Sequence, residues 1–332
     1  MKDITLDRSM TRLDEAILRT LLYFDIFNYP LKAEEVFKFL SSPAVDKSTV
    51  AERLNNLSDR KIVFRFNELF SVKNDPDLAQ RRLNGNREAE KYLVLARKKA
   101  KLISRFPFVR AVLASGSLSK GYMDKNSDLD FFIITAPKRL WIARTLLVLY
   151  KRLFLANSHK YFCVNYFVDE KHLEIEEKNL FTATELATVI PLQGAKQYED
   201  LQRVNSWLGE FFPNFRPQNV SNVPPVKLSR TRDAAERLMN FVFGDTLERY
   251  LQKKTLSRWK RIYEKNFSVS DFKIAFKSKA YASKNHPRNF QRAVIDLYAE
   301  KLRSFGLSAN QGAGVPIIPL HEEVTMKSNA GV

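Results

Sequence analysis

The stretch from Ala111 to Ile134, AVLASGSLSKGYMDKNSDLDFFII, predicts the centre of the fold. An apolar run reaches Gly116-Ser117, and after a spacer of ten residues a second apolar run begins with Asp128 and Asp130. Alternate residues of a β-strand point to the same face, so the two carboxylates are expected to leave the sheet together. The pattern therefore predicts a strand, a Gly-Ser turn, and a second strand that opens with a pair of acids.

This pair of acids favours a metal–nucleotide site. Two carboxylates a few Å apart repel each other unless a cation lies between them, and oxygen ligands suit Mg²⁺. The turn at Gly116-Ser117 offers backbone N–H groups and a hydroxyl that can receive a phosphate. The alternative is a Gly-Ser hairpin followed by a solvated Asp-x-Asp strand end. That alternative is disfavoured because two acids opening an apolar run cost stability when they have no partner.

The same residues resemble the signature of the nucleotidyltransferase superfamily, which has the DNA polymerase β-like fold. That signature is an apolar residue, Gly, Gly or Ser, a short spacer, and then Asp-apolar-Asp/Glu-apolar. The chain matches it with Ala114, Gly116-Ser117 and Asp128-Leu129-Asp130-Phe131. The match covers only residues 111–134, but it is specific because the turn, the spacer, both acids and both strands must agree.

The resemblance implies an enzyme that transfers a nucleoside monophosphate from a triphosphate such as ATP to an acceptor and releases pyrophosphate. The single cysteine favours a reduced cytoplasm for it. Asp128 and Asp130 would be the catalytic carboxylates and would bind Mg²⁺ or Mn²⁺. The residues implied to hold the nucleotide phosphates are Gly116, Ser117 and Lys120. The acceptor and the preferred base are not indicated, although a nucleic acid is one of the acceptor classes of the superfamily.

The family normally has a third carboxylate on the neighbouring strand, and this chain departs from that pattern. The matching apolar run, residues 161–168, has Asn165 as the polar residue at its centre. Asparagine cannot act as a base and is an uncharged ligand. Asp169 at the end of the run and Glu174 beyond it are the candidate substitutes. Alternatively, Asn165 could have only a structural role, because a buried Asn in a strand can simply hydrogen-bond to the neighbouring backbone.

Residues 1–75 are predicted to form a separate small domain. Apolar residues at helical spacing predict three helices, the third preceded by a Thr49-x-x-Glu52 capping box. Two short strands follow between residues 61 and 72. This order resembles a winged helix, whose third helix would enter the DNA major groove in a DNA-reading protein. Its solvent side is nearly neutral, so docking or regulation of the next domain is favoured over DNA reading.

The remaining chain completes a predicted α+β architecture, a small mixed-sheet nucleotidyltransferase core between the winged-helix-like domain and a C-terminal helical domain. A charged linker (74–86) precedes a helix (87–105), and the core spans residues 87–195. Residues 196–305 are expected to form a helical basic domain. The expected elements around and within it are a helix over 185–190 that ends at Pro191, a helix over 198–212 and a long helix over 229–252. Residues 306–332 lack periodicity and predict a disordered tail.

The net charge points to polyanionic partners. The chain has 55 Lys and Arg against 37 Asp and Glu, a formal charge of +18. Residues 227–303 contain 19 of these basic residues and 8 acidic ones, which favours nucleic acid, nucleotides or an anionic surface. Trp259 and Tyr263 lie among them. These aromatics would either stack bases or point into the core behind a solvated basic face.

The cysteine and hydropathy patterns suggest a reducing compartment and no membrane insertion. Cys163 is the only cysteine, so no intrachain disulfide can form. Residues 140–155 are apolar but are interrupted by basic residues and are too short to span a bilayer, so they predict a core helix. The four histidines have no metal-ligand spacing.

Two other functions remain open at this stage. The chain could be a catalytically weak or inactive nucleotide-binding regulator that carries a winged-helix domain, which Asn165 favours. It could also be the nucleotidyltransferase partner of a small helical protein in a toxin–antitoxin pair, which its length disfavours.

Overall fold

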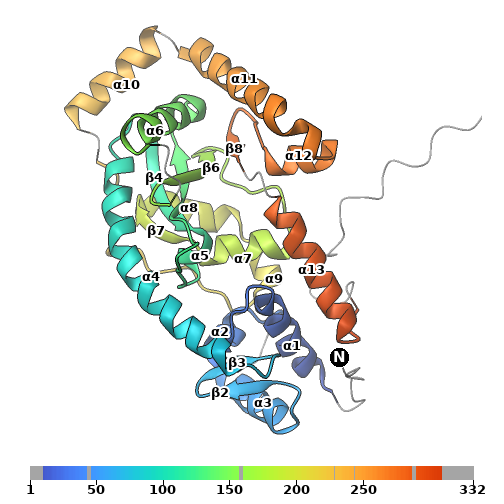
Figure 1. Cartoon of the computed structure of the whole chain (residues 1–332). Helices are drawn as coiled ribbons and strands as arrows, with labels where there is room; N and C mark the ends of the chain where they lie inside the picture. Colours follow the sequence, from blue (N-terminus) through green and yellow to red (C-terminus); the bar gives the residue numbers. More distant parts are fainter. Residues whose placement is uncertain are drawn as a thin grey trace, which may run out of the picture.

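The computed structural model describes residues 10–42, 46–156, 160–227, 229–242, 244–285 and 289–308. The fold is mixed α+β, as predicted, with a five-stranded sheet at its centre in the order β7-β4-β5-β6-β8 (Figure 1). The strands are β4 (Val109–Ser115), β5 (Asp130–Thr135), β6 (Cys163–Asp169), β7 (Ile190–Gln193) and β8 (Ala282–Lys284). Strands β5 and β6 are parallel, and the other neighbours are antiparallel.

Helices cover both faces of this sheet. One face, formed by Val112, Ala114, Phe131 and Ile133, packs against one helical layer. That layer contains α4 (Pro76–Ile103), α6 (Leu140–Phe154), α11 (Gly244–Tyr263) and α12 (Val269–Ala275). The opposite face packs against α7 (Leu180–Thr188), α8 (Ala195–Val204), α9 (Leu208–Phe211) and α13 (Phe290–Ser304). Because each strand alternates between the two cores, the strands read as nearly continuous apolar runs.

The N-terminal part has the predicted three helices and hairpin, together with one short strand that the sequence did not reveal. It consists of α1 (Arg12–Asp25), β1 (Leu31–Lys32), α2 (Ala33–Lys38), α3 (Lys47–Asp59), β2 (Phe64–Phe66) and β3 (Leu69–Ser71). The predicted Thr49–Glu52 capping box is wrong. The N-cap of α3 is Asp46, whose carboxylate accepts a hydrogen bond from the Thr49 N–H.

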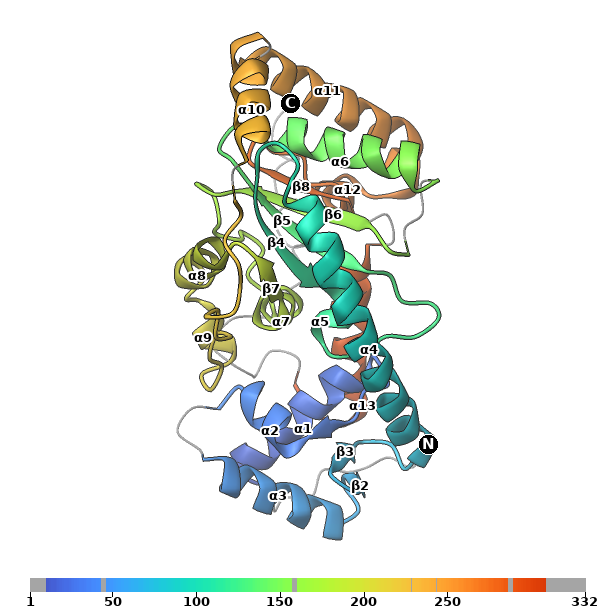
Figure 2. The ribbon, with the colours of Figure 1, turned by 90° about the vertical axis from the view of Figure 1, so that its left-hand side faces the viewer.

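The predicted charged linker is also wrong, because α4 is a continuous helix of 28 residues that begins at Pro76. Asp75 caps it, and proline at the first helical position needs no N–H partner. Figure 2 shows α4 running from the N-terminal part up to the sheet. Its charged first half lies against the N-terminal part, where the Arg82 side chain is buried and pairs with Glu35.

The elements after the core differ from the predicted helices. The helix expected over 185–190 is α7, and Pro191 lies instead in β7, an edge strand, where a missing N–H is tolerated. The helix expected over 198–212 is divided into α8 and α9. The long helix expected over 229–252 is divided into α10 (Arg230–Val242) and α11, which begins at Gly244 with a φ of +43°.

Residues 196–305 wrap around the core rather than forming a layer of their own. Strand β8 pairs with β6, and Glu248 of α11 accepts hydrogen bonds from the backbone N–H groups of Trp141 and Ile142 at the start of α6. Helix α13 returns to α1, where Lys301 forms an ion pair with Asp25. The expected disordered tail, apart from residues 306–308, lies outside the described residues.

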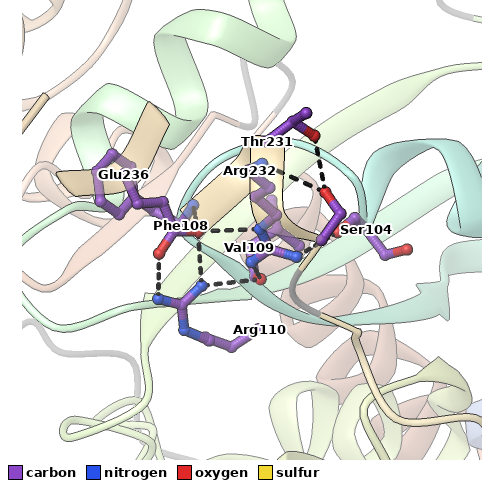
Figure 3. A network of polar contacts seen from close by, with 8 residues as sticks. Ser104, Phe108, Val109, Arg110, Thr231, Arg232 and Glu236 are labelled. Atoms are coloured by element: carbon purple, nitrogen blue, oxygen red, sulfur yellow. Dashed lines mark hydrogen bonds and ion pairs between the residues drawn. The ribbon is translucent and has the colours of Figure 1, made fainter. Parts of the chain in front are cut away.

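A buried ion-pair network fastens α10 to the start of β4 (Figure 3). The Glu236 carboxylate accepts a hydrogen bond of 2.7 Å from the Phe108 N–H and pairs with Arg110 and Arg232. The Arg232 guanidinium in turn donates to the carbonyls of Ser104 and Val109. Burial alone would raise the pKa of Glu236, but the hydrogen bonds from Arg110 and Phe108 hold it below its usual value.

Trp259 and Tyr263, the two aromatic residues singled out in the basic C-terminal segment, pack against the core. Trp259 is buried, and Tyr263 stacks on Phe276 with 4.7 Å between ring centroids. Lys253, Lys254 and Arg261 are exposed on the other side of α11. This is the solvated basic face behind core aromatics that the sequence left open as an alternative. No helix within the described ranges is both long and apolar enough to cross a membrane.

We predict that Glu236→Ala lowers the free energy of unfolding by about 3–5 kcal/mol, because it leaves the buried Arg232 guanidinium, the half-buried Arg110 guanidinium and a buried N–H without the carboxylate that they share. Urea denaturation measures the loss. The matched control is Asp233→Ala, on the same helix, whose partner Arg237 is largely exposed and whose loss should stay below about 1 kcal/mol. Equal losses in the two variants would contradict the role given to the buried network.

Candidate functional site

The carboxylate of Asp130 lies directly over Gly116. Strand β4 ends at Ser115, which pairs with Asp130 of β5, and the short helix α5 (Gly116–Ser119) follows at once. Gly116 has a φ of +63°, and a Cβ atom built there would lie 2.4 Å from Asp130 Oδ2. Both the left-handed backbone and the close approach therefore require glycine at this position.

Asp128 lies beside Asp130, just before the strand. The prediction that both acids open the strand is corrected, because β5 begins at Asp130. Between them Leu129 is buried and bonds through its backbone to Lys160 and Cys163, whereas the two acids are half-buried. Asp128 stands two residues before Asp130, and its charge contributes to raising the pKa of Asp130. The pair predicted from the sequence is therefore brought together.

Asn165 and Cys163 of β6 complete the surroundings of Asp130. The register between β5 and β6 shifts at Asn165, and such a bulge re-aims a side chain. Its Nδ2 lies 3.4 Å from Asp130 Oδ1 and 2.8 Å from Cys163 Sγ, and the Cys163 thiol is hydrogen-bonded to Asp130. Burial raises the pKa of Asp130 to about 6, and the charges of Asp128 and Glu185 add to the rise.

Glu185 of α7 is a site residue that the sequence analysis did not identify. Its charge contributes to raising the pKa of Asp130, and its Oε1 lies 2.7 Å from the ammonium of Lys120. It is the only charged residue in α7, whose sequence is LFTATELAT. A single acid in an otherwise apolar and small-residue helix was the available signal. Glu185 comes close to the Gly-Ser and Asp-x-Asp residues only because of the way in which α7 packs on the sheet.

Lys120 and Ser117 both lie at the turn. The Lys120 ammonium donates to the carbonyl of Gly116 at 3.2 Å as well as to Glu185. This places a cation between the backbone of the turn and a carboxylate of the site. Ser117 is half-buried in α5 next to Gly116. The predicted phosphate-binding residues are thus contiguous with the acidic pair.

Asp169 and Glu174, the other candidates for the third position, lie elsewhere. Parallel pairing places Cys163 beside Asp130 but Asp169 beside Thr135, at the opposite end of the same two strands. The Asp169 carboxylate is buried there against His172, 2.7 Å from its Nδ1. Glu174 is largely exposed and pairs with Lys178. Neither residue joins the acidic pair, whereas Asn165 does.

The N-terminal part holds the segment that follows the turn. The Tyr29 hydroxyl donates a hydrogen bond of 2.8 Å to the carbonyl of Lys120, and Asn86 of α4 donates to the carbonyl of Gly121. The Tyr122 ring lies against Gly85, whose carbonyl accepts from the next N–H along the segment. The position of the turn therefore depends on residues far away in the sequence.

Tyr23 makes a second connection from the N-terminal part. It lies in α1, and its side chain is hydrogen-bonded to Thr184, the neighbour of Glu185 in α7. The same helix thus contacts both the turn, through the loop that follows it, and the helix that carries Glu185.

A hard divalent cation fits this donor set. Asp128 and Asp130 offer carboxylate oxygens, and the missing side chain of Gly116 lets the Asp130 carboxylate approach the turn. In the described part of the chain no group of three or more His, Cys, Asp or Glu side chains is arranged to hold a metal. Mg²⁺ is commonly held by one or two carboxylates together with substrate phosphates and water, which is the number present here.

Comparisons with known proteins identify no relative. The chain matches no protein-family model, no curated protein and no solved structure. The function must therefore be argued from the site itself and from the short motif that carries the resemblance.

We predict that Gly85→Ala lowers the free energy of unfolding by about 1–3 kcal/mol, because a Cβ atom there overpacks against the Tyr122 ring. The distance from that Cβ to the nearest ring atoms would be 2.2 Å. The ring cannot simply swing away, since it also lies under the Arg81 guanidinium and against Tyr29. Urea denaturation measures the effect.

Gly209→Ala is the matched control, because its Cβ would meet nothing within 4 Å. Tyr122→Ala should remove most of the additional cost of Gly85→Ala when the two changes are combined. Additive losses in the double variant would contradict the contact.

Proposed function

We propose that the protein is a metal-dependent nucleotidyltransferase that moves a nucleoside monophosphate from a triphosphate to an acceptor hydroxyl and releases pyrophosphate. The observation that carries the proposal is the placement of the Asp130 carboxylate over a left-handed Gly116, with Asp128 beside it. That arrangement brings the backbone of the turn next to the acids. It agrees with the Gly-Ser and Asp-x-Asp motif of the nucleotidyltransferase superfamily.

The reaction forms one bond and breaks one. The acceptor oxygen bonds to the α-phosphorus, the bond from that phosphorus to the β-phosphate oxygen breaks, and the acceptor proton passes to a carboxylate. Asp128 and Asp130 would hold Mg²⁺ or Mn²⁺, which supplies charge stabilisation on the α-phosphate and the leaving pyrophosphate. The roles of the turn and of Glu185 follow from their contacts.

The turn residues orient the triphosphate. The backbone at Gly116 and the Ser117 hydroxyl would face the β- and γ-phosphates. The Lys120 ammonium would offset the phosphate charge, and it would give up part of its contact with Glu185 to do so. Asn165 has no basic atom, so Glu185 of α7 is the candidate to accept the acceptor's proton. A carboxylate from a helix thereby replaces the one that the superfamily carries on the neighbouring strand.

The N-terminal part, which resembles a winged helix, serves this site rather than DNA. Arg53 of α3, which was expected on the solvent side of this helix, is half-buried and pairs with the buried carboxylate of Asp14. Tyr29 and Tyr23 instead contact the turn and α7. These contacts favour docking and regulation of the core over entry of α3 into a DNA groove.

A second candidate function is nucleotide sensing without turnover. Asn165 beside Asp130 favours it, because the third carboxylate of the strand is missing. In that case the triphosphate would bind and alter the contacts of the turn with the N-terminal part, and no label would be transferred.

The test is incubation with each α-³²P-labelled nucleoside triphosphate, Mg²⁺ or Mn²⁺, and total RNA, cell extract or the protein alone as acceptor. We expect label transfer by the wild type and a decrease of at least about 100-fold in Asp128→Asn and Asp130→Asn, because each removes a charged ligand. Glu185→Gln should retain nucleotide binding and lose transfer.

Glu174→Gln is the control, since that acid is exposed and lies away from the site. Metal-dependent nucleotide binding without transfer would favour the sensor. Transfer that survives Asp130→Asn, or no nucleotide binding at all, would contradict the proposed site.

A further inference from the structure

A surface of exposed aromatic and basic side chains borders the acidic pair. We call it the mouth surface and define it by Lys125, Arg152, Phe154, Lys160 and Tyr161. These residues come from the loop before β5, the end of α6 and the residues just before β6. Phe154 is 70% exposed and Tyr161 is 40% exposed, which is unusual for rings of this size.

Backbone hydrogen bonds place this surface next to Asp128. The Leu129 N–H donates to the carbonyl of Lys160 at 2.8 Å, so Lys160 and Tyr161 run alongside the two acids. The Lys160 ammonium reaches the carbonyl of Lys125 at 3.4 Å. At the end of α6, Lys151 is close enough to Asp128 for that charge to counter the lowering of the Lys151 pKa by burial. A ligand on the mouth surface would therefore end at the carboxylates.

The two exposed rings are each supported from behind. Tyr161 stacks on Tyr92 of α4, with 6.2 Å between centroids and 20° between planes. Phe154 stacks on Tyr150, with 5.1 Å and 29°. Tyr150 also contacts Phe106 and Phe162, which lies directly beside Tyr161 in the chain. Each exposed ring thus has an aromatic neighbour on one side, and the Lys160 ammonium lies over the Tyr161 ring, 5.8 Å from its centroid.

The basic residues near these rings extend along α6 and α11, and the acid Glu88 is close to Tyr92. Arg152 and Arg258 are exposed, and their charges add to the burial that lowers the pKa of Arg144 to about 10. Among the described residues, no ion pair joins Arg152 or Arg258 to a carboxylate. The buried Arg144 itself stacks on Trp259, and its Nε has no hydrogen-bond partner in the part of the chain that is described.

From these observations we infer that the mouth surface binds the end of a single-stranded nucleic acid, which is the acceptor of the proposed transfer. Bases stack on the exposed faces of Tyr161 and Phe154, and the backbone phosphates follow Lys160, Arg152 and Arg258. Stacking on supported rings beside cations is how proteins hold single strands with little dependence on sequence. The inference rests on the proposed function only for the role of acceptor, because binding itself needs no transfer.

The position of the mouth surface favours a strand over an anionic membrane. Asp128 and Asp130 are half-buried, so a flexible strand end can reach them. An extended lipid surface cannot bend inward to the two carboxylates. A duplex presents no free base faces, so it cannot use the two rings. The surface therefore selects unpaired nucleotides.

The test is fluorescence anisotropy of the full-length protein with a labelled single-stranded RNA of about 12 nucleotides, within the range that single-strand sites cover. No nucleotide or metal is added. We expect Phe154→Ala/Tyr161→Ala to weaken binding at least about tenfold, since each stacked base is worth about 1–3 kcal/mol. Arg152→Gln should weaken binding and reduce its dependence on salt.

Tyr250→Ala is the matched control. Tyr250 is an exposed ring on α11 with a lysine over it, 5.6 Å from Lys254 Nζ to the ring centroid, but it lies outside the mouth surface. Its replacement should leave RNA affinity unchanged. Equal losses in the control and the double variant would overturn the inference, because binding would then not depend on the rings of the mouth surface in particular. Unchanged affinity in both would also overturn it, because binding would then reflect overall charge.

Two further results would also overturn it. One is equal or tighter binding to duplex RNA, and the other is binding to anionic phosphatidylserine vesicles but not to RNA. The Asp128→Asn variant separates this inference from the proposed function, because it should retain RNA binding. If the variant binds RNA and the wild type transfers no label, the proposed function is contradicted and the RNA-binding site is supported. If the wild type transfers label to another acceptor and binds no RNA, the inference is contradicted and the proposed function is supported.

Discussion

The Asp130 carboxylate occupies the space that a side chain at position 116 would need. Only glycine in a left-handed conformation lets strand β4 end there and α5 begin, because any Cβ would collide with that carboxylate. The antiparallel register that pairs Ser115 with Asp130 is what imposes the approach. This contact fixes where β4 gives way to α5, and burial together with the charges of Asp128 and Glu185 raises the pKa of Asp130.

The rest of the chain supports this contact from three directions. The bulge at Asn165 brings β6 alongside, α7 contributes Glu185, and the N-terminal part holds the turn through Tyr29. Segments far apart in sequence are fastened by buried polar contacts, of which the Glu236 network is the clearest (Figure 3). Breaking such a network costs free energy of folding. These contacts therefore hold the helices of residues 196–305 in one arrangement around the sheet.

The sequence predicted those features that depend on local pattern. The acidic pair and its strands were predictable because strand alternation and turn chemistry act over a few residues. Glu185 and Tyr29 were not, because their contacts with the turn arise only when α7 and α1 pack. The helical state of residues 76–86 was also missed, since the charged side chains that suggested a linker instead bind the N-terminal part, as Arg82 does.

The most direct measurement is the anomalous scattering of manganese in crystals grown with Mn²⁺ and a non-hydrolysable nucleoside triphosphate. The account predicts a peak bonded to carboxylate oxygens of both Asp128 and Asp130 at about 2 Å, with the triphosphate beside Gly116. A nucleotide bound elsewhere, or a peak that touches neither acid, would contradict it.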